Sequence, residues 1–233
     1  MIKSVIKLEG VWKTYRMGDV EVHALRGLDL DIREGEFVSI QGPSGSGKST
    51  AMNMIGCLDK PTKGRILLDG KDIAKLRESD LAQVRGKKIG FIFQQFNLIP
   101  TMSALENVAL PMMFQGVPRS ERLEKAQKYL ELVNLGDRVH HRPTEMSGGQ
   151  QQRVAIARSL VNDPQVLLAD EPTGNLDSST SNTVMEFLKK LHREEGKTVI
   201  MVTHDASTAR FADRVEYLMD GVIITKKKGG SKK

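Results

Sequence analysis

The stretch that decides the fold is Gly42-Pro43-Ser44-Gly45-Ser46-Gly47-Lys48-Ser49-Thr50. It matches the pattern G-x-x-x-x-G-K-[ST], in which a glycine-rich turn gathers several backbone N–H groups into one concavity. The apolar run Phe37–Ile40 before it predicts a strand, and residues 50–58 after it predict a helix. Because the N-terminus of a helix carries partial positive charge, we expect residues 42–50 to bind phosphate groups.

Two side chains of this stretch add to what the backbone offers. Lys48 is a mobile point charge suited to the β- and γ-phosphates of a nucleotide, and the Ser49 hydroxyl is a hard oxygen ligand for Mg²⁺. The simpler interpretation is a surface turn rich in Gly and Ser. Chance matches to the pattern arise on the order of once per hundred chains of this length, given glycine at about 7%. We therefore predict a phosphate-binding site with Mg²⁺.

Two carboxylates, Asp170 and Glu171, follow the apolar run Val166–Ala169. Ligands bind at the carboxyl ends of parallel strands, so Asp170 is predicted to hold Mg²⁺ directly or through water. Side chains alternate between the faces of a strand, so Glu171 is aimed elsewhere and is predicted to act as general base on a water near the γ-phosphate. Alone, such a pair often only caps a strand at a solvated turn. The phosphate-binding stretch upstream favours the functional interpretation.

Short strands and helices alternate along most of the chain. Strands are predicted at residues 5–8, 20–25, 28–32, 37–40, 65–68, 89–93, 166–169 and 198–203. Helices are predicted at residues 103–115, from Pro118 onwards, and at 149–161 and 179–195. This alternation predicts an α/β fold with a largely parallel sheet, and the helical stretch from about 94 to 161 predicts a subdomain inserted into it.

Composition limits the class of protein. The 233 residues suit one large domain or one domain with an insertion, and 39% apolar residues suffice for a core. The single cysteine, Cys57, excludes an intrachain disulfide and is expected to lie in the core. No apolar run approaches the roughly 18 residues of a membrane span, and the N-terminus does not resemble a signal peptide.

The net charge of +6 comes largely from the end of the chain, where residues 226–233 hold five lysines. One interpretation is a frayed, solvated tail. Another is weak attraction to an anionic membrane surface, worth about 1 kcal/mol per lysine. Because no stripe of aromatic and basic residues accompanies the charge, a nucleic-acid partner is not expected.

A third motif separates the classes of phosphate-loop protein. The segment Met146-Ser147-Gly148-Gly149-Gln150-Gln151-Gln152-Arg153 resembles the LSGGQ signature of ATP-binding-cassette (ABC) ATPases, with Met146 in place of Leu. Other residues resemble further motifs of that family in its order, over about residues 5–225. Tyr15 resembles the aromatic residue that stacks on adenine, and Gln94 resembles the Q-loop glutamine. Gly174-Asn175-Leu176-Asp177 resembles the D-loop, and His204 resembles the switch histidine.

The resemblance implies one ABC ATPase domain built from three parts. A P-loop NTPase core with a mostly parallel sheet and an N-terminal antiparallel β-subdomain would comprise residues 1–93 and 162–225. Residues 94–161 would form the inserted α-helical subdomain, and residues 226–233 a disordered basic tail.

The resemblance also implies how the site is assembled. Gln94 would join Ser49 and Asp170 at Mg²⁺, and His204 would contact the γ-phosphate. The active unit would be a head-to-tail homodimer with two ATP molecules at the interface. The signature residues Ser147, Gly148, Gly149 and Gln150 would face the ATP of the second copy, and Asp177 of the D-loop would also belong to the nucleotide site.

Some of these residues have simpler interpretations. Ser147 suits the N-cap of a helix. Tyr15 could be an ordinary strand aromatic, with Trp12 the competing candidate for base stacking, which is worth about 1–3 kcal/mol. His140 and His141 are interpreted as surface residues because no metal-ligand spacing accompanies them.

Local sequence around the motifs, such as Gly56–Thr62 and Phe93–Pro100, resembles the lipoprotein-release and macrolide-export branch of the family (LolD/MacB type). This implies a cytoplasmic ATPase, peripheral on the inner face of the cell membrane, that drives a separate transmembrane permease in export, lipoprotein release or mechanotransmission. The alternative is an ABC ATPase that regulates a membrane complex of cell-division or cell-wall type. The spacing of Lys48 and Asp170 leaves no room for the long coiled coil of chromosome-maintenance ATPases.

Apolar residues after Gln94 predict a groove for a short helix of the membrane subunit. Internal packing of the helical subdomain is the alternative interpretation of the same residues. They are Phe96, Leu98, Ile99, Met102 and the segment Met112–Phe114.

Overall fold

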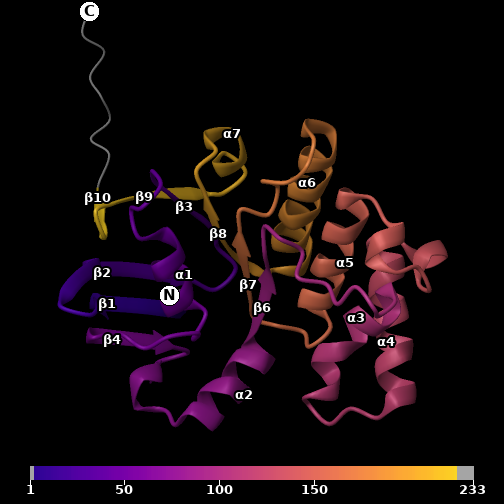
Figure 1. The fold of residues 1–233 in the computed structure, drawn as a ribbon, viewed down its shortest axis with the longest axis horizontal. Coiled ribbons are helices and arrows are strands. Elements are labelled where there is room, and N and C mark those ends of the chain that lie inside the picture. The colour runs from indigo at the N-terminus through magenta and orange to yellow at the C-terminus, as the bar shows by residue number, and fades with distance from the viewer. Residues whose placement is uncertain (1–2, 225–233) are drawn as a thin grey trace, which may run out of the picture. The chain divides into compact units, whose positions relative to one another are not determined.

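The structure is a computed structural model that describes residues 3–224 of the chain (Figure 1). The chain divides into two compact units, which are described in turn. The first comprises Met1–Leu76 and Met201–Lys233, and the second comprises Arg77–Ile200. The predicted basic tail, residues 226–233, lies outside the described residues.

An antiparallel sheet forms much of the first unit. Its strands are β1 (Ser4–Met17), β2 (Val20–Arg33), β4 (Lys63–Leu68) and β5 (Lys71–Asp72), in the order β2-β1-β4-β5. β1, β2 and β4 lie side by side in Figure 1. The predicted N-terminal antiparallel subdomain is therefore confirmed.

The prediction of two short strands at 20–25 and 28–32 is wrong, because β2 runs unbroken through both. Val11 pairs with Leu28 and Trp12 pairs with Arg26, so Gly27 is an extra residue bulged out of the register. Gly27 has a φ of 82°, which an L side chain rarely adopts. Gly27, which lies between the two predicted strands, is therefore a β-bulge within one long strand.

The first unit also holds parallel strands. β3 (Phe37–Gln41) pairs in parallel with β9 (Arg214–Met219), and β10 (Val222–Ile224) pairs antiparallel with β9. Their order is β10-β9-β3-β8, where β8 (Thr198–Thr203) crosses from the second unit. Two helices, α1 (Lys48–Ile55) and α7 (Ala206–Ala209), and a 3₁₀ turn at Ile73–Lys75 complete the unit.

Strands of the second unit continue the parallel pattern. β6 (Ile89–Ile92) pairs in parallel with β7 (Val166–Asp170), and the order is β8-β7-β6. Val166–Ala169 and all of β8 are buried, as expected for strands inside a parallel sheet. The unit also contains α2 (Glu78–Lys88) and α6 (Ser178–Glu195). α2 was not predicted, because it buries only Leu81 and has no apolar stripe.

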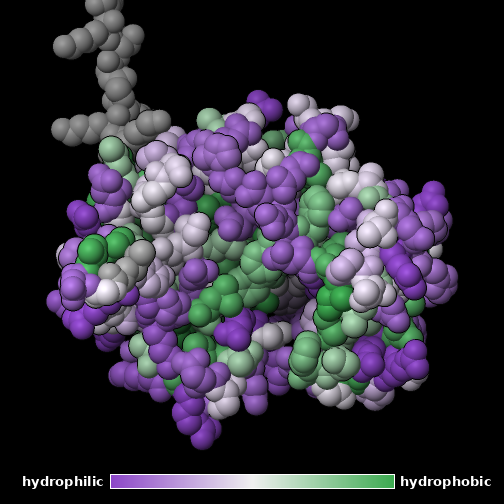
Figure 2. All heavy atoms as spheres, in the orientation of Figure 1, coloured by the Kyte–Doolittle hydropathy of each residue, from purple (hydrophilic) through white to green (hydrophobic). Residues whose placement is uncertain are grey.

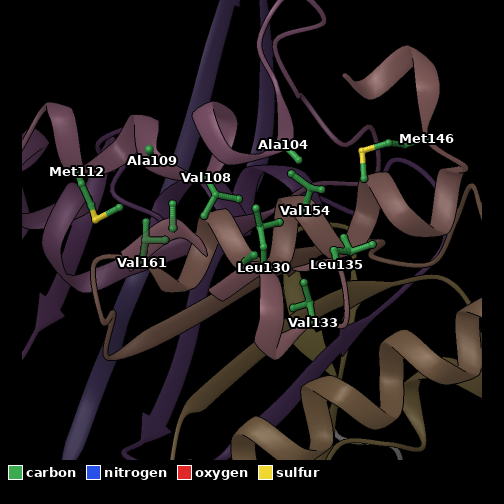
Figure 3. Close-up of a cluster of buried hydrophobic side chains, with 12 residues drawn as sticks. Ala104, Val108, Ala109, Met112, Leu130, Val133, Leu135, Met146, Val154 and Val161 are labelled. Atoms are coloured by element: carbon green, nitrogen blue, oxygen red, sulfur yellow. The ribbon is translucent and has the colours of Figure 1, made fainter. Parts of the chain in front are cut away.

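Three further helices of the second unit surround a common apolar core. They are α3 (Ala104–Met113), α4 (Arg119–Leu132) and α5 (Gly148–Leu160), with 3₁₀ turns at Gly136–Arg138 and Pro143–Glu145. Figure 3 shows their core side chains, among them Val108, Leu130 and Val154, which are fully buried. On the face shown in Figure 2, hydrophilic residues predominate at the outer side of these helices. The helices predicted at 103–115, from Pro118 and at 149–161 are therefore confirmed.

One part of the predicted groove is wrong. Met112 is 1% exposed and belongs to this core, where Figure 3 shows it, and Leu98 packs against the same core. For these two residues internal packing is the correct interpretation. The next residues of the segment differ, since Met113 is 45% and Phe114 is 74% exposed.

The architecture confirms the predicted α/β class with an antiparallel N-terminal sheet, a largely parallel sheet and a group of helices. The predicted domain boundaries at 93 and 162 remain predictions. Within residues 3–224, no helix is both long and apolar enough to cross a membrane.

Candidate functional site

Backbone geometry shapes the predicted phosphate loop between β3 and α1. Gly47 is the N-cap of α1 with a φ of 101°, and a Cβ there would lie 2.5 Å from the Ala24 carbonyl oxygen. A Cβ on Gly42 would lie 2.1 Å from the carbonyl oxygen of Leu218. Only glycine fits at these two positions, so both ends of the loop require the residue that the motif supplies.

The polar groups of this loop fit a phosphate. Lys48 is 9% exposed, and its ammonium donates to the carbonyl oxygens of Gly42 (2.9 Å) and Pro43 (2.8 Å), which hold the side chain against the loop. The Ser46 hydroxyl is buried and has no hydrogen-bond partner among the described residues. The first N–H groups of α1 also lack acceptors within the helix. An anion in the loop would satisfy these donors together.

Tyr15 lies in a cluster with Lys13 and Asp59. Its hydroxyl donates to Asp59 Oδ2 at 3.2 Å, and the Lys13 ammonium lies 2.6 Å from Asp59 Oδ1 and 5.0 Å from the centre of the Tyr15 ring. Asp59 follows the loop helix in sequence, so Tyr15 is tied to the same part of the chain as the phosphate loop. Trp12, by contrast, stands edge-on to His23. The arrangement supports Tyr15 over Trp12 as the base-stacking candidate.

Two groups of this cluster have shifted pKa values. Burial, together with the charge of Asp59, raises the pKa of Tyr15, so its hydroxyl stays protonated and can donate. For Asp59, burial acts to raise the pKa, but the hydrogen bond from Lys13 and the Lys60 N–H outweigh it and hold the pKa below its ordinary 3.8. Cys57 is buried nearby, which confirms the prediction of a core residue.

His204 also lies in the first unit, directly after β8, and its side chain is exposed. The next residue, Asp205, is the N-cap of α7 and accepts from Ser207 N at 2.8 Å. Hydrogen bonds from Ser207 lower the pKa of Asp205 below its ordinary value. The cap fixes the turn on which His204 stands.

In the second unit, Asp170 ends β7 and Glu171 begins a strained turn. Glu171 has a φ of 43°, and the proline that follows also restricts its backbone. Such a conformation costs about 1–3 kcal/mol and persists only where its surroundings hold it. One such contact is the hydrogen bond from Gly174 N to the Glu171 carbonyl, at 3.0 Å. Strain at a candidate general base is typical of a functional site.

The signature segment forms the start of α5. Ser147 is its N-cap and accepts from Gln150 N at 3.3 Å, while Gln150 Oε1 accepts from Ser147 N at 2.8 Å. This confirms the N-cap interpretation of Ser147, whose side chain is exposed at the helix end. A Cβ on Gly149 would lie 2.3 Å from Thr180 Cγ2, so this glycine allows close approach of α6.

The Q-loop and D-loop candidates lie against each other in the second unit. Asn175 Nδ2 donates to the Gln94 carbonyl at 2.9 Å, and a Cβ on Gly174 would lie 2.8 Å from Gln94 Nε2. Asp177 is the N-cap of α6. Its carboxylate accepts from Thr180 Oγ1 at 2.6 Å and from Thr180 N at 3.0 Å. These hydrogen bonds lower the pKa of Asp177 below its ordinary value, so it remains an anion at neutral pH.

Each unit thus assembles a different set of the predicted residues. The first contains Tyr15, residues 42–50 and His204, and the second contains Gln94, residues 147–150, Asp170, Glu171 and Asp177. Sequence reasoning missed the supporting residues Lys13, Asp59, Gln152, Asn175 and Thr180. Of these, Gln152 and Asn175 stand inside the quoted motifs and Asp59 inside the quoted stretch Gly56–Thr62, and their position there was the available signal.

Known proteins were compared with this chain. Residues 25–174 match the model of the family described as "ABC transporter". An ABC transporter ATP-binding protein of Thermotoga maritima is 54% identical over 95% of this chain and 94% of its own length. A macrolide export ATP-binding/permease protein MacB of Brucella melitensis is 52% identical over 95% of this chain, which spans only 34% of that relative.

A solved structure has the same fold. It is described as a dimeric structure of a post-hydrolysis state of the ATP-binding cassette MJ0796 bound to ADP and Pi. It aligns with a TM-score of 0.88 and 51% identity over 97% of this chain and 99% of that one. MJ0796 is an ABC transporter ATP-binding protein of Methanocaldococcus jannaschii. The chain therefore belongs to the ABC transporter family, as an ATPase cassette of the branch that includes the MacB ATP-binding components.

Proposed function

We propose that this chain hydrolyses ATP as the peripheral motor subunit of an ABC transporter and thereby drives a separate transmembrane permease. The single observation that carries the proposal is the phosphate loop. It combines a Lys48 side chain held against the loop, a buried Ser46 hydroxyl without a partner among the described residues, and glycines where no other residue fits.

Each candidate residue takes a role that its position supports. Residues 42–50 bind the β- and γ-phosphates, Lys48 turns its ammonium from the loop carbonyls to the phosphates, and Tyr15 stacks on the base. Glu171 accepts a proton from the attacking water, and His204 contacts the γ-phosphate. A general base of this kind accelerates its reaction by about 10²–10⁴-fold.

Mg²⁺ is the ion that the chemistry of the candidate oxygen donors favours. The Ser49 hydroxyl is exposed on the first turn of α1, and Asp170 is partly exposed at the end of β7. These two, with the side-chain oxygen of Gln94, are the hard ligands that Mg²⁺ prefers. When bound, the ion neutralises negative charge on the phosphates.

The signature end of α5 completes the site in a second copy. Residues 147–150 place a helix N-terminus and an exposed capping serine at the surface. We propose that they bind the γ-phosphate held by the other copy, with Asp177 beside them. The dimeric state of MJ0796, 51% identical to this chain, supports this assignment.

The permease is proposed to dock on the exposed residues at the C-terminal end of α3, where Met113 is 45% and Phe114 is 74% exposed. The MacB relatives carry an ATP-binding part and a permease part in one protein, and this chain aligns with a third of their length. A chain that binds such a permease would lie at the inner face of the membrane. The catalytic residues and these relatives favour transport over a purely regulatory role.

ATP hydrolysis by the purified chain tests the proposal. Lys48→Ala removes the cation that faces the phosphates, so we expect ATP affinity to fall at least about 10-fold and hydrolysis to be lost. Lys75→Ala is the matched control, because Lys75 is exposed and pairs only weakly, at 3.9 Å, with Asp72. Hydrolysis at the wild-type rate in Lys48→Ala would contradict the assignment of the site.

A further inference from the structure

Gln152 on α5 is a fully buried side chain with a half-satisfied amide. Its Nε2 donates to the carbonyl oxygen of Pro172 at 2.5 Å. Its Oε1 is also buried and has no hydrogen-bond partner among the described residues. Buried polar atoms are nearly always paired in folded proteins, so this amide calls for an explanation.

The acceptor of that hydrogen bond belongs to the strained turn after β7. Pro172 follows Glu171, whose φ of 43° places it in the left-handed region. A proline disfavours helical backbone in the residue before it, so this turn relaxes unless neighbouring contacts hold it. Pro172 is itself buried, and its carbonyl is held by an element distant in sequence.

The other end of the contact leads to the signature. α5 begins at Gly148 with Ser147 as its N-cap, and Gln152 lies on the second turn of the helix. An α-helix is stiff over one turn, because the backbone N–H of each residue donates to the carbonyl four residues earlier. The orientation of the Pro172–Thr173 peptide, to which the accepting carbonyl belongs, is therefore fixed relative to the residues that cap the helix.

We propose that Gln152 is a positioning residue that holds the Glu171 carboxylate in register with the signature end of α5. The inference rests on the proposed role of Glu171 as general base. The hydrogen bond to the Pro172 carbonyl couples the turn that carries Glu171 to α5. When the signature binds nucleotide, the turn therefore moves together with it. An apolar side chain of similar length would fill the same space without leaving an unpaired oxygen. The hydrogen bond from Nε2 to the Pro172 carbonyl, which holds the turn, therefore explains why an amide stands here.

The test compares two buried polar side chains of the same helix. Gln152→Met keeps the length and removes the donor. Ser159→Ala is the control, because the Ser159 hydroxyl donates only to Ile156 within the helix, at 2.7 Å. We expect Gln152→Met to lower kcat about 10- to 100-fold, as a misplaced catalytic group does, with ATP affinity and KM within twofold of wild type. Ser159→Ala should keep the wild-type kcat.

A measurement without hydrolysis separates this inference from the role of Glu171. Gly174 N donates to the Glu171 carbonyl, so amide hydrogen exchange at Gly174 reports whether the turn is held. We expect exchange across residues 170–176 to speed up in Gln152→Met and to stay unchanged in Ser159→Ala. If Glu171→Gln kept wild-type hydrolysis, the general-base assignment would fail, while faster exchange would still support Gln152 as the holder of the turn.

Two results would overturn the proposal. The first is unchanged amide exchange in a folded Gln152→Met protein. A residue that acts through Glu171 should cause no further loss of kcat once Glu171 is replaced. The proposal would therefore also be overturned if the two losses of kcat multiplied in the double variant of Gln152→Met and Glu171→Gln. If Gln152→Met fails to fold, Gln152→Asn serves instead. It keeps the amide but is one methylene too short to reach Pro172, and the same outcomes apply.

Discussion

Single residues set the chemistry of the base-binding end of the site. Tyr15, Lys13 and Asp59 form a cluster in which a carboxylate joins a phenol to an ammonium. The sequence predicted Tyr15 alone, because no pattern assigns a role to Lys13 and Asp59 lies 44 residues away in the chain. Tertiary contacts between β1 and the segment after α1 determine the partners of Tyr15, and the motif does not specify these contacts.

The Asp59 pair predicts a pH dependence of stability. The pKa of Asp59 is lowered in the folded protein, so its carboxylate stabilises the fold above its ordinary value of 3.8, and this contribution is lost as the pH falls through the folded pKa. Asp59→Asn should therefore destabilise the protein at pH 7, and the difference from wild type should shrink below about pH 4. Urea unfolding over a pH series measures it. A Glu186→Gln control on the exposed face of α6 should show a much smaller difference, and a constant difference for Asp59→Asn would contradict the pairing.

Elements were predicted well where their apolar period is clear. α3 to α6 each bury one face, and β7 and β8 are buried runs, so periodicity was sufficient. α2 lacks an apolar stripe and was missed, and β2 has a bulge at Gly27 and was predicted as two strands. The chemistry of the motifs was predictable, but the helix contacts that support them were not.

The contact between α5 and α6 gives a prediction at this scale. A Cβ on Gly149 would lie 2.3 Å from Thr180 Cγ2, whereas one on Gly148 would meet nothing closer than 3.6 Å. Gly149→Ala should therefore destabilise the protein by about 1–3 kcal/mol, as overpacking does, and Gly148→Ala should be tolerated.

A second variant tests the cause of that loss. Thr180→Ser removes the clashing methyl group and keeps the Oγ that bonds to Asp177, so it should restore the stability of Gly149→Ala. Urea unfolding of the single and double variants measures the coupling. Equal losses in Gly148→Ala and Gly149→Ala would show that the close approach is not the cause.

At the scale of the whole molecule, the chain divides its site residues between two units, and a membrane partner is expected to act on them. The prediction of a docking groove was too broad, because Met112 and Leu98 belong to the core around α3 to α5. Apolar side chains next to a helix end have the same appearance in a sequence whether they face inward or outward. The exposed fractions of the side chains restrict the proposed docking surface to the residues around Phe114.

Docking of the permease is tested at Phe114. Phe114→Glu places a charge on a side chain that is 74% exposed, so folding and basal hydrolysis should be unchanged while co-purification with the membrane subunit is lost. Leu132→Glu is the matched control, because Leu132 is 42% exposed at the end of α4. Intact co-purification of Phe114→Glu, or equal loss in the control, would contradict this surface.

The central claim is an ATPase whose site is completed by a second copy, and the most direct measurement is the mass of Glu171→Gln in solution with and without ATP. Light scattering should give a dimer with ATP and a monomer without it, because the variant retains the phosphate loop but loses the carboxylate that activates water. Ser147→Arg on the same background should still bind ATP and stay monomeric. A monomer with ATP bound to Glu171→Gln, or hydrolysis at the wild-type rate, would contradict the account.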